Sequence, residues 1–128
     1  MTMTLNQLAL IAFGGAIGAV LRFVASNAVH QMLGRGFLYG TLTVNVLGSF
    51  IMGLLYIALV ERSGLSEQWR AVLIVGLLGA FTTFSTFSIE TFLLIENKEL
   101  TKAMLNIVLS VGLCLGGTWL GIMIGRSL

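Results

Sequence analysis

Four long apolar stretches limit what this chain can fold into. They cover roughly residues 5–29, 41–60, 71–95 and 103–124, with short connections between them. Each approaches or exceeds the ~20 residues that a helix needs to cross a hydrocarbon core of ~30 Å. The alternating pattern of membrane β-barrel strands is absent. The sequence therefore predicts an all-α integral membrane protein, one domain of four transmembrane helices over residues 1–128.

The scarcity of charge excludes several other classes of protein. Only 9% of the residues are charged, whereas a soluble domain carries about 25%. The seven basic side chains are too scattered to indicate nucleic-acid binding. The single Cys114 provides neither an internal disulfide nor a cysteine-based metal site. No nucleophile–base pair or catalytic carboxylate pair is visible, so we expect no enzyme.

Basic residues are divided almost evenly between the two sides of the predicted membrane domain. Four crossings put three on one side: Arg62, Arg70 and Arg126. The other side has three, with Arg22 near that end of the first span: Arg35, Lys98 and Lys102. Orientation normally follows the Lys/Arg bias, and this chain has little. Two interpretations are open: insertion in both orientations with an antiparallel dimer, or one orientation set by subtler signals.

Glycines at four-residue spacing predict close packing between the helices. They are Gly14 and Gly18, Gly112 and Gly116, then Gly117, Gly121 and Gly125. Small residues at this spacing let helix backbones approach closely within a membrane. Four helices are hardly enough to surround a pore, so an oligomer that combines two chains would be an economical transporter.

Residues 82–88, "TTFSTFS", place five hydroxyl groups and two phenylalanines inside the third apolar stretch. A serine or threonine can bond to the carbonyl four residues back, but five adjacent hydroxyls point around the whole helix. Polar side chains within spans are costly and suggest function. Others in the four stretches include Arg22, Thr43, Asn45, Glu90, Asn106, Ser110 and Thr118.

Asn45 and the hydroxyls are neutral donors that can replace part of an ion's hydration shell. Phe84 and Phe87 are three residues apart and share a helical face. The edge of a phenyl ring is electropositive. The combination predicts a lining suited to a small anion, although the phenylalanines alone would also fit ordinary core packing.

Arg22 and Glu90 are the charged groups closest to this region. Arg22 either extends to the membrane interface or attracts anions to an entrance. Glu90 either pairs with another group, accepts hydrogen bonds from hydroxyls, or is protonated.

The stretch before the hydroxyl cluster is a weak helix former. Gly76 and Gly79 precede the β-branched Thr82 and Thr83. If the third helix is interrupted at the membrane centre, its freed carbonyls must find partners. Such carbonyls hold Na⁺ in some transporters, so a bound cation is one possibility here.

These motifs resemble the Fluc/CrcB family of fluoride channels. The matching segments are "GGAIGAVLR" at 14–22, "GTLTVN" at 40–45 and "GLLGAFTTFSTFSIE" at 76–90. The resemblance implies an antiparallel, dual-topology homodimer in the bacterial cytoplasmic (inner) membrane. Such a dimer has two pathways that export fluoride passively and protect the cell from fluoride toxicity.

The resemblance also implies roles for individual residues. The pathway would include Asn45, Phe84 and Phe87, a polar track of Ser85, Thr86 and Ser88, and further Thr43 and Ser110. Arg22 and Glu90 would supply vestibule or supporting charge. A structural Na⁺ at the dimer interface would be held by the backbone carbonyls of Gly79 and Thr82. The family commonly has Gly-Gly in the break, where this chain has Gly79-Ala80 followed by Phe81.

Two other functions are compatible with parts of the sequence. A small multidrug-type, proton-coupled antiporter needs a carboxylate in a span, and Glu90 is the only one here. A non-transporting subunit would explain the glycines but would leave the hydroxyl cluster without a purpose.

Overall fold

The structure, a computed structural model, describes residues 2–62 and 66–128 and is helical over most of them. Its elements are α1 (Leu5–Leu33), α2 (Tyr39–Tyr56), the π-helical η1 (Ile57–Glu61), α3 (Glu67–Arg70), the π-helical η2 (Ala71–Leu78), α4 (Gly79–Phe81), α5 (Phe84–Glu96) and α6 (Leu100–Ser127). Together they form four candidate membrane spans: Leu5–Leu33, Tyr39–Glu61, Glu67–Glu96 and Leu100–Ser127. The predicted all-α architecture with four spanning helices is confirmed.

Local signals explain where the long helices begin and end. α1 starts at a capping box, in which Thr4 and Gln7 each bond the other's backbone N–H. It stops at Gly34, whose φ of 81° suits glycine. Between α5 and α6, Lys98 adopts a φ of 61°, and the Glu99 N–H bonds the Leu94 carbonyl. This pattern ends a helix sharply and lets α6 return beside α5.

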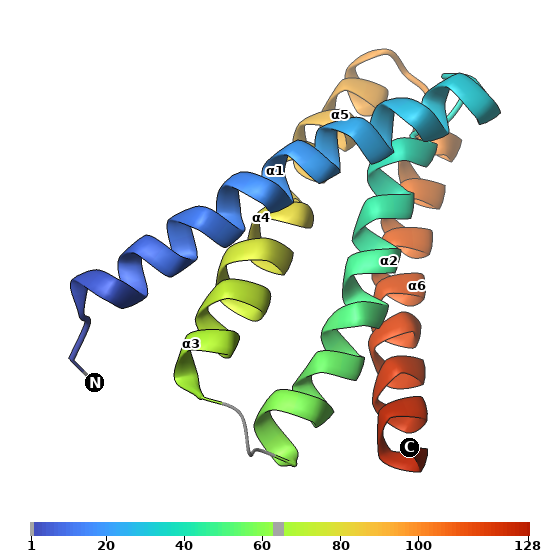
Figure 1. Ribbon diagram of the computed structural model, residues 1–128. Coiled ribbons are helices and arrows are strands. Elements are labelled where there is room, and N and C mark those ends of the chain that lie inside the picture. The colour runs from blue at the N-terminus through green and yellow to red at the C-terminus, as the bar shows by residue number, and fades with distance from the viewer. Residues whose placement is uncertain (1, 63–65) are drawn as a thin grey trace.

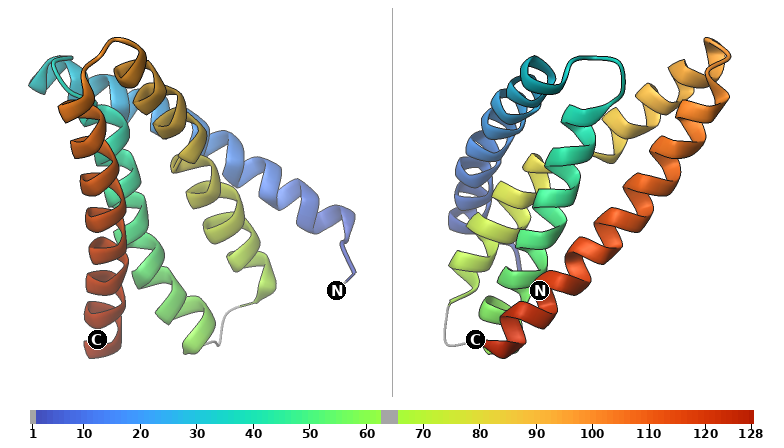
Figure 2. Two further views of the ribbon diagram at one scale, coloured as in Figure 1. Left: turned by 180° about the vertical axis from the view of Figure 1, so that it is seen from behind. Right: turned by 90° about the vertical axis from the view of Figure 1, so that its right-hand side faces the viewer.

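Consecutive spans run in alternating directions, and α2 and α6 lie side by side (Figures 1 and 2). Their contact is the most extensive in the chain, followed by that of α1 with η2. α1 crosses obliquely over α4 and the start of α2 (Figure 1). The α2–α6 pair and the α1–η2 pair thus form two arms that meet near α4 and α5.

Glycines make close backbone contacts within each arm. Gly18 of α1 lies against the backbone of Leu77, and Gly121 of α6 lies against the backbone of Phe50 and Gly53. A methyl group at either glycine would overlap a backbone carbonyl. By contrast, Gly112 and Gly116 have open space around them within the chain. The glycine series therefore divides into positions that pack inside one chain and positions that do not.

The third span changes backbone conformation between α4 and α5. Thr82 has φ −88° and ψ 154°, and Thr83 has φ −149° and ψ 115°, so both are extended. Thr83 then caps α5, because its hydroxyl oxygen accepts from the Thr86 N–H at 3.1 Å. Phe81, the bulky residue before this segment, is buried, and its ring lies beside Gly48 of α2.

The glycine contacts yield a stability prediction with a control on the same helix. Gly121→Ala should destabilise the chain by about 1–3 kcal/mol, because the added carbon forces two rigid backbones apart. Gly112→Ala should be neutral or stabilising, since alanine favours a helix by about 1 kcal/mol over glycine. Thermal unfolding in detergent compares the two variants. Equal melting temperatures would contradict the packing described here.

Candidate functional site

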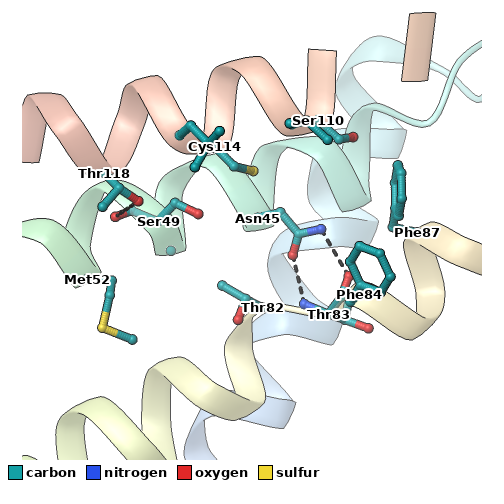
Figure 3. A pocket seen from close by; sticks show the side chains of 13 residues that line it. Asn45, Ser49, Met52, Thr82, Thr83, Phe84, Phe87, Ser110, Cys114 and Thr118 are labelled. Atoms are coloured by element: carbon teal, nitrogen blue, oxygen red, sulfur yellow. Dashed lines mark hydrogen bonds between the residues drawn. The ribbon is translucent and has the colours of Figure 1, made fainter. Parts of the chain in front are cut away.

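A cavity of about 390 Å³ lies between α2, α6 and the segment that joins α4 to α5 (Figure 3). Its lining consists of Asn45, Gly48, Ser49, Met52, Thr82, Thr83, Phe84, Phe87, Ser110, Val111, Cys114, Leu115 and Thr118. None of these side chains is acidic or basic. The polar groups that face the cavity are amide, hydroxyl and thiol, and the remaining wall is apolar.

Asn45 holds the extended segment in place. Its Nδ2 donates to the Thr83 carbonyl at 3.0 Å, and its Oδ1 accepts from the Thr83 N–H at 2.7 Å. Figure 3 shows this pair of bonds at the edge of the cavity. Backbone groups that leave a helix inside a membrane need such partners. One buried amide therefore satisfies both polar backbone groups of Thr83.

Arg22 supports the same segment from α1. Its Nε donates to the Ala80 carbonyl at 3.0 Å, and the side chain is half-buried. Gly18, one turn earlier on α1, brings the two backbones together and places Arg22 over the end of α4. Within this chain Arg22 is therefore a hydrogen-bond donor to the backbone of α4.

Three carbonyls at and just after α4 accept no hydrogen bond from the residues that the structure describes: those of Gly79, Phe81 and Thr82. The N–H that would bond Gly79 in a continuous helix belongs to Thr83, and it bonds Asn45 instead. The N–H that would bond Thr82 belongs to Thr86, and it bonds the Thr83 hydroxyl. Hence the Ala80 and Thr83 carbonyls are paired, while those of Gly79, Phe81 and Thr82 are not.

The two phenylalanines of the hydroxyl cluster line the same cavity as Asn45. Their ring centroids are 5.2 Å apart, with the ring planes tilted by 45°. Phe87 is half-buried, whereas Phe84 is 76% exposed. Ser110 of α6 lies across from them (Figure 3). It is buried, and its hydroxyl makes no hydrogen bond to the described part of the chain.

The remaining hydroxyls of the cluster bond mainly to one another and to nearby backbone. The Thr83 Oγ1 lies 3.2 Å from the Ser85 Oγ and 3.1 Å from the Thr86 Oγ1. The Ser88 hydroxyl donates to the Phe84 carbonyl at 2.9 Å. Ser85, Thr86 and Ser88 do not line the cavity but continue from it along α5.

Thr43 and Glu90 are not brought into the cavity. Thr43 is exposed on another face of α2 and lines an apolar groove with Val46, Phe50 and residues of α6. Glu90 is half-buried on α5, and its Oε1 is buried without a hydrogen bond from any described residue.

Several lining residues were not predicted from the sequence. Ser49 follows Asn45 by four residues on α2, and Cys114 and Thr118 follow Ser110 at the same spacing on α6. The Thr118 hydroxyl donates to the Ser49 carbonyl at 3.1 Å and joins the two helices. Their four-residue spacing from Asn45 and Ser110 could have predicted these positions, because residues four apart share a helical face.

The role of Asn45 can be tested by substitution. Asn45→Leu keeps the approximate side-chain volume but leaves the N–H and carbonyl of Thr83 unpaired. The expected loss of stability is about 1–3 kcal/mol for each unpaired group, measured by thermal unfolding in detergent. Asn27→Leu is the control, since the Asn27 amide bonds only the Phe23 carbonyl of its own helix. A similar melting temperature for both variants would contradict the bonding described for Asn45.

Comparison with known proteins agrees with the resemblance seen in the motifs. The family described as "CrcB-like protein, Camphor Resistance (CrcB)" matches residues 9–122. The chain is 52% identical over 121 residues to a fluoride-specific ion channel FluC of Hydrogenovibrio crunogenus, covering 94% of this chain and 92% of that protein. It is 55% identical over 117 residues to that of Shewanella amazonensis, covering 91% and 94%.

A relative with the same name from Methylococcus capsulatus is 52% identical over 118 residues. The match covers 92% of this chain but only 52% of that protein, so the chain spans about half of its length. The four spans, the family match and these relatives lead to one conclusion. The chain is a multi-pass membrane protein that belongs to the CrcB-like family.

Proposed function

We propose that this chain is a fluoride-specific ion channel that exports fluoride passively across the cytoplasmic (inner) membrane of a bacterium. The observation that carries the proposal is the neutral lining of the cavity, built from Asn45, hydroxyl groups and phenyl rings. Donors without a fixed charge suit a small, strongly hydrated anion that must also leave again. The names of relatives that are half identical supply the identity of the anion.

The chemistry of the lining explains how fluoride would be held. An amide NH₂ has two N–H groups, and Asn45 uses one of them for the Thr83 carbonyl. The second is available to an anion, as is the unpaired hydroxyl of Ser110. The edges of Phe84 and Phe87 add weak positive potential beside these donors. Ser85, Thr86 and Ser88 would form the polar track by which the ion continues along α5.

Passive export needs no coupled reaction. Fluoride enters a cell as its membrane-permeable weak acid and is trapped as the anion at cytoplasmic pH. An interior-negative potential drives the anion outward with about 2.3 kcal/mol per charge per 100 mV. A selective conduit is therefore sufficient to protect the cell from fluoride toxicity.

A second copy of the chain would complete the pathway as an antiparallel homodimer with dual topology. Phe84 is 76% exposed beside the cavity. A second chain would cover this ring and close the pathway on that side. The near balance of basic residues across the membrane supports insertion in both orientations.

The extended segment would interrupt the third span at the membrane centre. The span Glu67–Glu96 has 30 residues, and α5, which follows the extended pair, accounts for the last 13. The parts of the span before and after Thr82 and Thr83 thus differ in length by only two residues. The interruption and the cavity would share one depth in the membrane.

A structural Na⁺ at the dimer interface fits the residues present. The Gly79 and Thr82 carbonyls are hard oxygen donors without hydrogen bonds from the described residues. Carbonyls of this kind suit an alkali cation. Bound there, Na⁺ would supply one positive charge near the pathway. The two residues that follow Gly79 have other contacts. The Ala80 carbonyl accepts from Arg22, and the Phe81 ring lies beside Gly48.

The antiporter alternative lacks a comparable site. It requires a carboxylate where substrate and proton compete, and Glu90 does not line the cavity. Arg22, which would provide vestibule charge in the channel, is hydrogen-bonded to Ala80 instead of to an acidic partner.

The phenylalanines give the main functional prediction. Phe84→Ile and Phe87→Ile should each lower fluoride efflux from liposomes by tenfold or more, because aliphatic groups lack the electropositive ring edge. Phe92→Ile is the matched control, since Phe92 is an exposed residue of α5 outside the cavity. Efflux is read with a fluoride electrode, and cross-linking verifies the dimer. Unchanged efflux in both cavity variants would reject this assignment of the pathway.

The sodium site gives an independent prediction that does not depend on flux. Elemental analysis of protein purified in Na⁺-free buffer should find about one sodium per two chains, because carbonyls from both copies would hold one ion. K⁺ is the control, and it should not be retained. Sodium at background level, or in one-to-one ratio with the chain, would contradict a single site at a dimer axis.

A further inference from the structure

A chain of two hydrogen bonds, one buried and one part-buried, connects α6 to the Phe87 carbonyl. The Asn106 Nδ2 donates to the Thr91 Oγ1 at 2.8 Å, and this hydroxyl donates to the Phe87 carbonyl at 2.7 Å. Asn106 is 2% exposed and Thr91 is 7% exposed. Thr91 thus acts as both acceptor and donor, and the amide of one helix reaches the backbone of another.

The two residues lie just outside the cavity, yet each is one turn from a residue that lines it. Thr91 follows Phe87 by four residues on α5, and Asn106 precedes Ser110 by four residues on α6. Residues four apart lie on one helical face. The hydrogen bonds therefore join the two walls of the cavity directly beside Phe87 and Ser110.

No other side-chain hydrogen bond joins α5 to α6 among residues 2–62 and 66–128. Within the chain, α6 is also the main neighbour of α5. Apolar contacts alone fix helix positions poorly in a membrane, because lipid tails compete with them on equal terms. The hydrogen bond between Asn106 and Thr91 is therefore important for the distance between α5 and α6.

We propose that Asn106 and Thr91 are positioning residues that set the separation between the Phe87 ring and the Ser110 hydroxyl, and thereby the selectivity for fluoride over chloride. The inference rests on the proposed channel function. A narrow gap lets a small anion touch ring edge and donor together. A wider gap weakens the contacts with fluoride and admits the larger chloride ion.

The test compares four single variants in liposomes loaded with both anions. Asn106→Leu and Thr91→Val remove the link with little change in side-chain volume, and Thr91→Ser retains the hydroxyl. Asn27→Leu is the matched control, because its amide bonds only the Phe23 carbonyl of α1. Fluoride and chloride efflux are read with ion-selective electrodes, and melting temperature is recorded for each variant. Asn106→Ala replaces Asn106→Leu if the latter does not assemble.

We expect the variants that break the link to lose selectivity and the variant that retains the Thr91 hydroxyl to keep it. Fluoride efflux should fall about tenfold in Asn106→Leu and Thr91→Val, with chloride release becoming measurable. Thr91→Ser and Asn27→Leu should behave as the wild type. The double variant Asn106→Leu with Thr91→Val should be no worse than either single one, since both changes break the same link.

Other results would overturn the inference. Wild-type efflux of both anions in Asn106→Leu and Thr91→Val, even with a lowered melting temperature, would mean that the link is only structural. Failure of Thr91→Ser to retain selectivity would mean that the hydroxyl is not the relevant group. Absence of fluoride efflux from the wild type would instead reject the channel function, and the inference with it.

Discussion

The pairing of backbone groups inside a membrane is the constraint on which the site depends. At Thr82 and Thr83 the third span leaves the helical conformation, and the freed N–H and carbonyl groups have no bulk water available to them. Asn45 satisfies Thr83, and Arg22 satisfies Ala80. The carbonyls of Gly79, Phe81 and Thr82 accept no hydrogen bond from the described residues. Two of these, Gly79 and Thr82, are the carbonyls to which the proposed Na⁺ would bind.

The packing within the two arms positions the side chains around the extended segment. Gly18 brings α1 close to η2 and places Arg22 over the end of α4. Gly121 brings α6 close to α2, so that Ser110 lies across the cavity from Asn45. These contacts use backbone against backbone, which is the packing available where lipid removes the hydrophobic force between helices. Small residues far from the cavity thus fix the positions of the donors within it.

The sequence predicted the four spans, because their lengths and composition leave few alternatives, and it singled out Asn45 with Phe84 and Phe87. It did not predict which face of each helix turns inward. Thr43 was grouped with Asn45, but residues two apart on a helix point in different directions, and the structure places Thr43 on an apolar groove. The partner of Arg22 depends on how α1 crosses α4, a tertiary contact that no local pattern encodes. Cys114 received no role in the pathway, although its spacing from Ser110 places it in the cavity wall.

Electrogenic fluoride efflux by the wild-type protein is the most direct test of the account. Purified protein in liposomes with a K⁺ gradient is measured with and without valinomycin, while fluoride, chloride and pH are followed together. The account predicts rapid fluoride release that requires the ionophore, with chloride retained and no accompanying movement of protons. Fluoride release that ignores the ionophore and moves protons, or no release at all, would contradict it and point to Glu90 as the group that carries the transport chemistry.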